Sequence, residues 1–371
     1  MSSSTAAEQA AAAGLAAPPP AHCPGPSGDE AGKTSACAGC PNQAACASGA
    51  AGKAASQLSG DAAAVARRLS PVRHVVLVLS GKGGVGKSTF SSQLAWALAE
   101  RDGGSREVGL LDVDICGPSA PRMTGLEREE IHQSAEGWSP VYAADNLGVV
   151  SIGFMLPNPD EAVVWRGPRK NALITQFLRD VHWGELDYLV LDAPPGTSDE
   201  HISVAQLLAG ARLAGAVILT TPQEVAVMDV RKELSFCKKV GVPVLGVVEN
   251  MAPMRQPLER CAFVRPDGAD VSAAAREALV AAGLGNVAMV ADIFQANQGG
   301  GEAMAEAAGV PFLGRVPLDP ALGKAAEAGV AIGSQDPQAP AAKALDAIIS
   351  NLIERLETEG SESTPSQSAK H

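Results

Sequence analysis

The sequence has no hydrophobic run long enough to cross a membrane and no export signal. No stretch of the 371 residues reaches the roughly 18 consecutive apolar residues that a membrane-spanning helix needs. The N-terminus also lacks a basic start followed by an apolar segment, and its first arginine is Arg67. We therefore expect a cytoplasmic protein with no membrane partner.

Basic residues are fewer than acidic residues, and they do not cluster along the sequence. The chain has 29 lysines and arginines against 41 acidic residues, which gives a formal net charge of −12. Proteins that bind nucleic acid neutralise its phosphates with clustered lysine and arginine, so we do not expect nucleic acid as a partner. Hydrophobic residues make up 46% of the chain, which is enough for a substantial core.

The two ends of the chain differ in composition from its centre. Residues 1–60 are rich in Ala, Gly, Ser and Pro without an amphipathic period, and the C-terminus from Glu359 is polar. These shifts predict three parts: a flexible N-terminal extension over 1–66, one folded domain over 67–356 and a disordered tail over 357–371.

Strand-like and helix-like patterns alternate along the centre. Strands are predicted at Arg73–Leu79, Glu107–Asp112, Leu147–Ile152, Tyr188–Asp192, Ala216–Thr220, Val244–Glu249 and Phe312–Val316. Helices are predicted at Thr89–Arg101, Arg169–Val181, Ser198–Leu208, Val225–Val240 and Pro340–Leu356, and an insertion at Pro253–Val290 with one helix near Ser272–Ala281. This alternation predicts an α/β fold with a doubly wound, mostly parallel sheet, whose ligands lie beyond the carboxyl ends of the strands.

A glycine-rich loop between the first strand and the first helix is the clearest functional signal. It reads Gly81, Lys82, Gly83, Gly84, Val85, Gly86, Lys87 and Ser88, and Thr89 follows. In a phosphate-binding loop, backbone N–H groups surround the phosphates, the final lysine reaches the outer phosphates and the next hydroxyl holds Mg²⁺. We therefore predict that Gly81–Thr89 binds ATP, with Lys87 catalytic and Ser88 as the magnesium ligand. Lys82 is a second cation that the basic motif does not require.

The same letters fit a second kind of phosphate loop. The three spaced glycines also make the G-x-G-x-x-G pattern of a dinucleotide site, with Asp112 in place of the ribose-binding acid. That pattern does not need the lysine and serine that end the loop. A separate apolar strand, Tyr188–Leu191, is followed by Asp192, which suits indirect binding of Mg²⁺ in an NTPase. The two signals together favour a nucleoside triphosphatase.

Further polar residues follow strand ends at the same edge of the expected sheet. Asp114 is the candidate to orient the attacking water or to accept its proton. Asp112 either supports Mg²⁺ indirectly or caps the turn at Gly117–Pro118. Asn250 is expected to bind the base, although an asparagine after a strand is also a common turn residue. Gly196 is expected to offer its N–H group to the γ-phosphate, in a loop that changes shape on hydrolysis.

These segments together resemble the Mrp/NUBP family of iron–sulfur scaffold ATPases, which belongs to the MinD/ParA-like class with a deviant Walker A loop. The resemblance runs from about Arg73 to Val330, and it rests on the loop with Lys82, Asp112–Ser119, Asp192–Thr197 and Glu249–Met251. In that class the extra lysine crosses a dimer interface to the phosphates of the partner. The resemblance therefore implies a homodimer, a catalytic role for Lys82 and a weak ATPase activity that controls the shape of the dimer.

Four of the seven cysteines lie in the N-terminal extension: Cys23, Cys37, Cys40 and Cys46. Thiols clustered in a cytoplasmic chain indicate metal binding rather than disulfides, and their chemistry suits a [4Fe–4S] cluster or zinc equally well. The spacing resembles that of the eukaryotic cytosolic member of the family, whose N-terminal extension carries a ferredoxin-like cluster. The resemblance thus implies a [4Fe–4S] cluster on these four cysteines.

One feature of the family is missing. The family usually has a Cys-x-x-Cys shortly after Glu249–Met251, through which two subunits share a bridging cluster, whereas this sequence has only Cys261 in that stretch. In this respect the sequence resembles the green-lineage branch of the family, which lacks the pair.

The function that the resemblance implies is ATP-dependent assembly of [4Fe–4S] clusters and their transfer to cytosolic and nuclear apoproteins. The implied partners are a second copy of the chain, related scaffold subunits in larger or mixed assemblies, and downstream cluster-transfer proteins and apoproteins. Two alternatives stay open at this point. One is a MinD/ParA-like positioning ATPase without a cluster, and the other is a zinc-binding regulatory ATPase.

Overall fold

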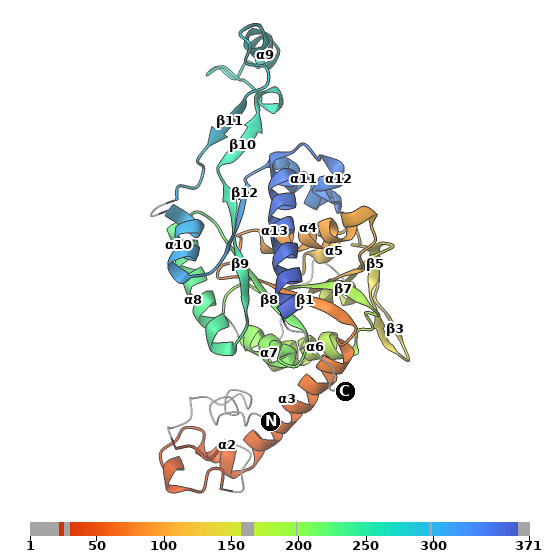
Figure 1. Ribbon diagram of the computed structural model, residues 1–371, viewed down its shortest axis with the longest axis vertical. Coiled ribbons are helices and arrows are strands. Elements are labelled where there is room, and N and C mark those ends of the chain that lie inside the picture. Colours follow the sequence, from red (N-terminus) through yellow and green to blue (C-terminus); the bar gives the residue numbers. More distant parts are fainter. Residues whose placement is uncertain (1–21, 26–29, 157–166, 198, 297–298, 363–371) are drawn as a thin grey trace, which may run out of the picture.

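The computed structural model describes residues 22–25, 30–156, 167–197, 199–296 and 299–362. Within them, eight strands form one central sheet in the order β12-β9-β8-β1-β7-β2-β6-β5 (Figure 1). All neighbouring pairs are parallel except β5 and β6, which are antiparallel. The strands are β1 (Val72–Ser80), β2 (Val108–Asp112), β5 (Val141–Ala144), β6 (Leu147–Ser151), β7 (Leu186–Asp192), β8 (Leu213–Thr220), β9 (Val244–Ala252) and β12 (Phe312–Pro317). The doubly wound, mostly parallel sheet expected from the sequence is confirmed.

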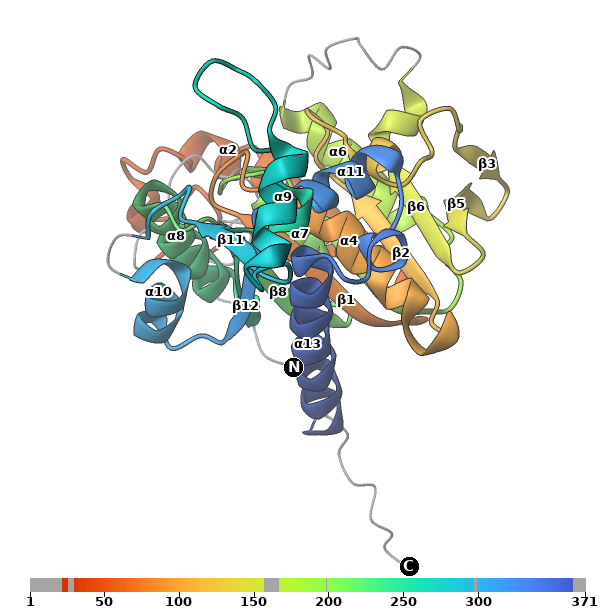
Figure 2. The same cartoon turned by 90° about the horizontal axis from the view of Figure 1, so that it is seen from above.

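Helices cover both faces of the sheet. Side chains alternate between the two faces along each strand, and in the central strands they are apolar on both faces, so each face needs a covering layer. On β1, Val76 and Val78 belong to one core and Val75 and Leu77 to the other. The first core lies under α4 (Lys87–Glu100), α5 (Ala120–Met123), α11 (Pro320–Ala328), α12 (Ile332–Gln335) and α13 (Pro340–Glu362), with α13 beside α4 (Figure 2). The second lies under α3 (Ala50–Arg68), α6 (Gly167–Asp180), α7 (Asp199–Leu208), α8 (Glu224–Val240) and α10 (Gly300–Ala308).

The five expected helices are present, and most of their ends are shifted by no more than a few residues. Ser198, the expected start of one of them, lies outside the described residues. The last helix, α13, continues past the expected domain end at 356 to Glu362. The expected tail over 357–371 is therefore helical where it is described, and its last nine residues, 363–371, lie outside the description.

The insertion forms an arm that projects from the body (Figure 1). It consists of an antiparallel ribbon, β10 (Met254–Pro257) and β11 (Ala288–Ala291), and of α9 (Ser272–Ala281), the helix expected there. A second small hairpin, β3 (His132–Ser134) and β4 (Gly137–Ser139), lies near the other edge of the sheet. No helix among the described residues combines the length and the apolar character needed to cross a bilayer.

The N-terminal extension contains a long helix that its composition did not indicate. α3 crosses the expected boundary between residues 66 and 67, and it packs against α6 and α7. Val65 in this helix and Leu69 just after it are fully buried, so they anchor its C-terminal end in the second core. Alanine is the commonest residue of the helix, and alanine has the highest helix propensity of all residues. The short helix α2 (Gln43–Ala47) precedes it and carries Cys46.

Candidate nucleotide site

The phosphate loop connects β1 to the N-terminus of α4. Gly84 and Gly86 have φ angles of +82° and +83°, which are in the left-handed region that glycine adopts without strain. Helix α4 begins at Lys87 directly after Gly86, so the positive end of the helix dipole faces the loop. The side chain of Lys82 is exposed at the surface of the loop. This is the strand–loop–helix geometry that the sequence predicted.

The second lysine of the loop is buried and paired. Lys87 Nζ lies 2.6 Å from Asp192 Oδ1, and the two side chains are 6% and 2% exposed. Lys87 Nζ also donates to Ser88 Oγ at 3.3 Å. Ser91, one helical turn later, donates its hydroxyl to the same carboxylate oxygen at 2.8 Å. The structure thus brings together three predicted residues, Lys87, Ser88 and Asp192, and adds Ser91, which no motif in the sequence singled out.

Asp112 is fully buried and holds the loop that follows β2. Its carboxylate accepts hydrogen bonds from the backbone N–H groups of Asp114 at 3.0 Å and of Ser119 and Ala120 at 3.2 Å each, and from Ser151 Oγ at 3.1 Å. Burial, followed by the charge of Asp192, raises the pKa of Asp112 to about 7, while Lys87 acts in the opposite direction. These contacts fix the loop on both sides of Gly117–Pro118, and both the capping of that turn and the indirect support of Mg²⁺ stay predictions.

Asp114 lies further out in the same loop. Its pKa is also raised, first by burial and also by Asp192, while the Lys87 ammonium lowers it. A carboxyl group with a raised pKa is better able to accept a proton near neutral pH. The charges of Lys87 and Asp192 act on the pKa of both Asp112 and Asp114. The four side chains therefore form one electrostatic unit at the carboxyl ends of β2 and β7.

Asn250, near the end of β9, contacts the phosphate loop directly. Its Nδ2 donates to the backbone oxygen of Val85 at 2.8 Å, and the side chain is 6% exposed. A Cβ atom added to Gly86 would collide with the same Nδ2. The next residue, Met251, has a φ angle of +53°, which is uncommon for a residue with a side chain. Asn250 therefore supports the phosphate loop through its hydrogen bond to Val85, and its contact with a base stays a prediction.

The loop after Asp192 contacts the end of β1, directly before the phosphate loop. The N–H group of Gly196 donates to the backbone oxygen of Ser80 at 2.8 Å, and Gly196 has a φ angle of +82°. The N–H group that we expected to meet a γ-phosphate thus has a protein acceptor in this structure.

Cys116, in the loop after β2, has an exposed thiol that lies beside the Lys170 ammonium, which is also 3.4 Å from Glu200 Oε1. Both contacts raise the pKa of Lys170.

The four cysteines of the extension lie close to one another ahead of α3. Burial and then the charges of Cys23, Cys40 and Cys37 raise the pKa of Cys46, so the thiols are near enough to influence each other. The pKa of Cys37 is lowered, chiefly by the hydroxyl of Thr34, whose Oγ1 lies 3.3 Å from its Sγ. Across the described part of the chain, no three Cys, His, Asp or Glu side chains are arranged to hold a metal ion. Four thiols have the ligand chemistry that an iron–sulfur cluster or a zinc ion requires, but in this structure they are not in a ligating arrangement.

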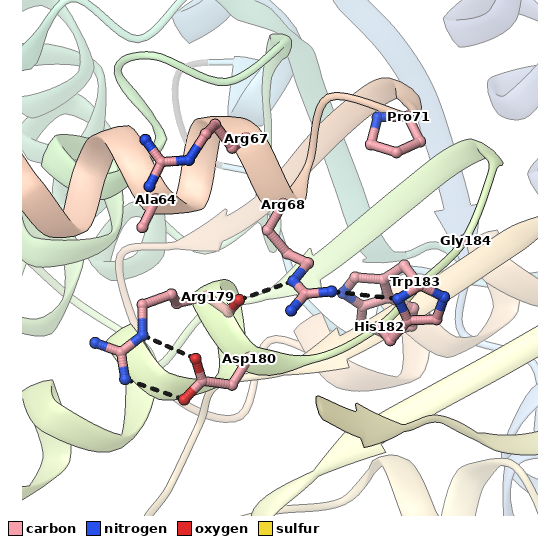
Figure 3. Close-up of a pocket in the computed structure, with 9 residues that line it drawn as sticks. All are labelled: Ala64, Arg67, Arg68, Pro71, Arg179, Asp180, His182, Trp183 and Gly184. Carbon is pink, nitrogen blue, oxygen red and sulfur yellow. Dashed lines mark hydrogen bonds and ion pairs between the residues drawn. The ribbon is translucent and has the colours of Figure 1, made fainter. Parts of the chain in front are cut away.

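An arginine network fastens the extension to the body (Figure 3). Arg179 of α6 pairs with Asp180 at 2.8 Å and with Asp61 of α3 at 3.2 Å. Arg68, at the end of α3, donates to the backbone oxygen of Arg179 at 3.0 Å and hydrogen-bonds with His182 Nδ1 at 3.2 Å. Arg68, Arg179, Asp180 and His182 line a cavity of about 430 Å³. The network holds the last turns of α3 against α6, so the helix that follows the cysteine segment is fixed to the body.

A family profile described as the ParA, NUBPL iron-transfer P-loop NTPase matches residues 71–297 and 279–353. The chain belongs to this family. The match includes the phosphate loop, Asp112, Asp192, Asn250 and the arm, and it begins after the four-cysteine segment.

The chain is also similar to solved structures, and the first of the two named here supports this assignment. A nucleotide-binding protein of Archaeoglobus fulgidus in complex with ADP is 31% identical over 74% of this chain and 93% of its own, with a TM-score of 0.54. The cell-division ATPase MinD of Pyrococcus furiosus is 19% identical over 76% of this chain and 99% of its own, with a TM-score of 0.47. The relation to the Mrp/NUBP-like P-loop NTPases that the sequence suggested is confirmed.

Proposed function

We propose that this NTPase binds ATP and Mg²⁺ and acts as a scaffold that assembles [4Fe–4S] clusters and transfers them to apoproteins. Two features of the chain support the proposal together. One is the phosphate loop, with Lys87, Ser88 and Asp192 in contact. The other is the set of four cysteines, in which the charges of Cys23, Cys37 and Cys40 act on Cys46. Neither feature alone distinguishes a scaffold from a positioning ATPase or from a zinc protein.

In the nucleotide site, Gly81–Thr89 would surround the phosphates, and Lys87 would leave Asp192 to bind the outer phosphates. The Ser88 hydroxyl and, through water, the Asp192 carboxylate would then hold Mg²⁺. Asp114 would orient the attacking water or accept its proton, Asp112 would keep the Asp114 loop in place, and Asn250 would bind the base as well as support Val85. Hydrolysis is slow and controls the shape of the dimer rather than supplying chemical work.

Lys82 is exposed on the loop, where a second subunit could receive it. We propose that it reaches the phosphates bound by that subunit, so that ATP closes a homodimer. Larger or mixed assemblies with related scaffold subunits would use the same face. The protein would act in the cytoplasm and would serve cytosolic and nuclear apoproteins through downstream transfer proteins.

In the extension, Cys23, Cys37, Cys40 and Cys46 would hold the cluster as thiolates. Thiolates are the usual protein ligands of iron–sulfur clusters, and four of them complete a [4Fe–4S] site. The hydroxyl of Thr34 would favour the thiolate form of Cys37, because its contact with the sulfur lowers the pKa of that thiol.

Transfer itself tests this function. The protein reconstituted with labelled iron is mixed with an apo-ferredoxin that accepts a [4Fe–4S] cluster, and labelled iron in the re-isolated acceptor is measured with and without ATP. We expect ATP to change the transfer rate in the wild type and to have no effect in Lys87→Ala, which keeps all four cysteines. Transfer at the same rate with and without ATP in the wild type would contradict a scaffold that depends on ATP.

A further inference from the structure

A cavity of about 590 Å³ lies where the arm leaves the body, outside the nucleotide site and the cysteine segment. Its walls come from the β10–β11 ribbon, from the end of β12 and from the first turn of α13, which lie side by side at the base of the arm (Figure 1). Arg255 and Val290 face each other across the ribbon and both line the cavity. The volume is in the range of sites that bind a ligand.

The cavity carries positive charge that the protein does not neutralise. Arg255 and Lys343 are exposed, and neither has an ion-pair partner among the described residues. Arg315, the third cation of the lining, differs because Glu249 and Glu302 hold it at 2.8 and 2.7 Å. Helix α13 begins at Pro340 in the wall and adds the positive end of its dipole, although Asp319 accepts from the N–H group of Ala341. In a chain with a net charge of −12, this hollow is therefore a local concentration of positive charge.

The lining of the cavity also contains exposed apolar groups. Val290 is 57% exposed, and prolines and alanines supply much of the remaining wall. Met289, the neighbour of Val290 on β11, is also exposed but lies on the opposite face of the ribbon, because side chains alternate along a strand. A small anion would use only the two cations of the cavity, whereas a protein segment would pair with the cations and also cover Val290 and the prolines. Exposed apolar surface next to charge is typical of an interaction site for a protein.

We propose that this cavity, the arm-base pocket, binds a segment of another protein in which acidic residues flank an apolar side chain. Carboxylates of the segment would pair with Arg255 and Lys343, and its apolar side chain would pack on Val290. Recognition of acidic motifs by clustered basic side chains is an established mode of peptide binding. The inference rests on the proposed function only in taking the partner to be a protein that delivers or receives clusters.

A random twelve-residue peptide library displayed on phage provides the test. Selection uses the iron-free, nucleotide-free full chain, so failure of cluster binding, measured separately as iron content, does not affect the outcome. We expect the recovered peptides to combine Asp or Glu with Leu, Ile or Phe. Synthetic copies should bind Arg255→Glu/Lys343→Glu at least about tenfold more weakly by fluorescence anisotropy.

The matched control is Lys238→Glu/Lys239→Glu, which makes the same change in charge at exposed positions on α8. It should bind the peptides as the wild type does, and all three proteins should melt at similar temperatures. A selection without acidic and apolar enrichment would overturn the proposal. So would peptides that bind the arm-base variant as tightly as the wild type, or that are lost equally in the control.

Discussion

Lys87 and Asp192 form a buried ion pair across the nucleotide site, with Nζ and Oδ1 2.6 Å apart. The lysine comes from the start of α4 and the aspartate from the end of β7, so the pair joins the phosphate loop to the neighbouring strand. The ammonium group that the loop would offer to a phosphate is thus held by the carboxylate that would act on Mg²⁺. When ATP and Mg²⁺ bind, Lys87 would instead contact the outer phosphates, and Asp192 would hold Mg²⁺ through water.

Lys87→Ala should abolish ATP binding and also destabilise the fold. The substitution leaves a buried carboxylate without its cation, which costs about 3–5 kcal/mol. The double variant Lys87→Met/Asp192→Asn removes both charges, so it should regain most of the lost stability and still fail to bind ATP. Urea denaturation and titration with a fluorescent ATP analogue measure the two effects. Tight ATP binding by either variant would show that Lys87 does not contact the phosphates.

Lys82→Ala should have a different effect, because this side chain is exposed and has no role in the core. We expect unchanged stability and ATP binding, but slower hydrolysis and loss of the ATP-dependent dimer. Phosphate release and light scattering after size-exclusion chromatography measure these quantities. Wild-type turnover together with a wild-type dimer would remove the case for a lysine that crosses between subunits.

Gly86→Ala and Asn250→Ala should not be additive in their effect on stability. Alanine at 86 suffers both from a φ angle of +83° and from a collision with Asn250 Nδ2, and only the collision disappears when Asn250 is shortened. Asn250→Ala alone leaves the Val85 oxygen without its donor, at a cost of about 1–3 kcal/mol. The double variant should therefore lose less stability than the sum of the two single variants.

Gly84→Ala is the control for this pair. Gly84 has nearly the same φ angle, +82°, but a Cβ atom added there would meet no other atom within 4 Å. Gly84→Ala and Asn250→Ala should therefore be additive in urea denaturation. Additivity in both pairs would mean that Asn250 does not support the loop through Gly86.

Much of this site could be predicted because its signals are local in sequence. The glycines, Lys87 and Ser88 stand together, and Asp192 ends an apolar strand, so residue type and strand context were sufficient. The roles of Asp112 and Asn250 could not be settled in this way. The sequence left a ligand-binding role open for both, against a turn-capping role for Asp112 and an ordinary turn residue for Asn250. Only the positions of Ser119, Ala120 and Val85 in space show which protein groups they contact.

The fold was predictable to a similar degree. Strands with continuous apolar residues were evident, but the strand order and the antiparallel β5 depend on pairing between distant segments. Helix α3 was missed because its many alanines, glycines and serines resemble a low-complexity linker. Its anchors, Val65 and Leu69, are recognisable as core residues only once α6 and α7 are in place.

Glu233 predicts how the stability of the domain depends on pH. This carboxyl group of α8 is fully buried, and neither oxygen has a hydrogen-bond partner among the described residues. Burial, and then the charge of Asp229, raises its pKa from 4.5 to about 7. Between these pH values the folded chain holds a proton that the unfolded chain has lost, so the free energy of unfolding should fall as the pH rises from about 4.5 to about 7.

Glu233→Gln cannot ionise and should remove this dependence. At about pH 8 the variant should be more stable than the wild type by about 1–3 kcal/mol, and below about pH 4.5 the difference should disappear. Urea denaturation at a series of pH values gives the comparison. A constant difference between the two proteins across the series would mean that Glu233 does not titrate in the folded chain as its burial requires.

Metal analysis after anaerobic reconstitution tests most directly whether the cysteines of the extension hold a [4Fe–4S] cluster. Iron, acid-labile sulfide and zinc are measured in the wild type, in Cys37→Ala/Cys40→Ala and in Cys261→Ala, which changes a thiol outside the extension. We predict iron and sulfide in the wild type and in Cys261→Ala, and their loss in the double variant. Iron that remains unchanged in the double variant, or zinc in place of iron in the wild type, would contradict the proposed cluster site.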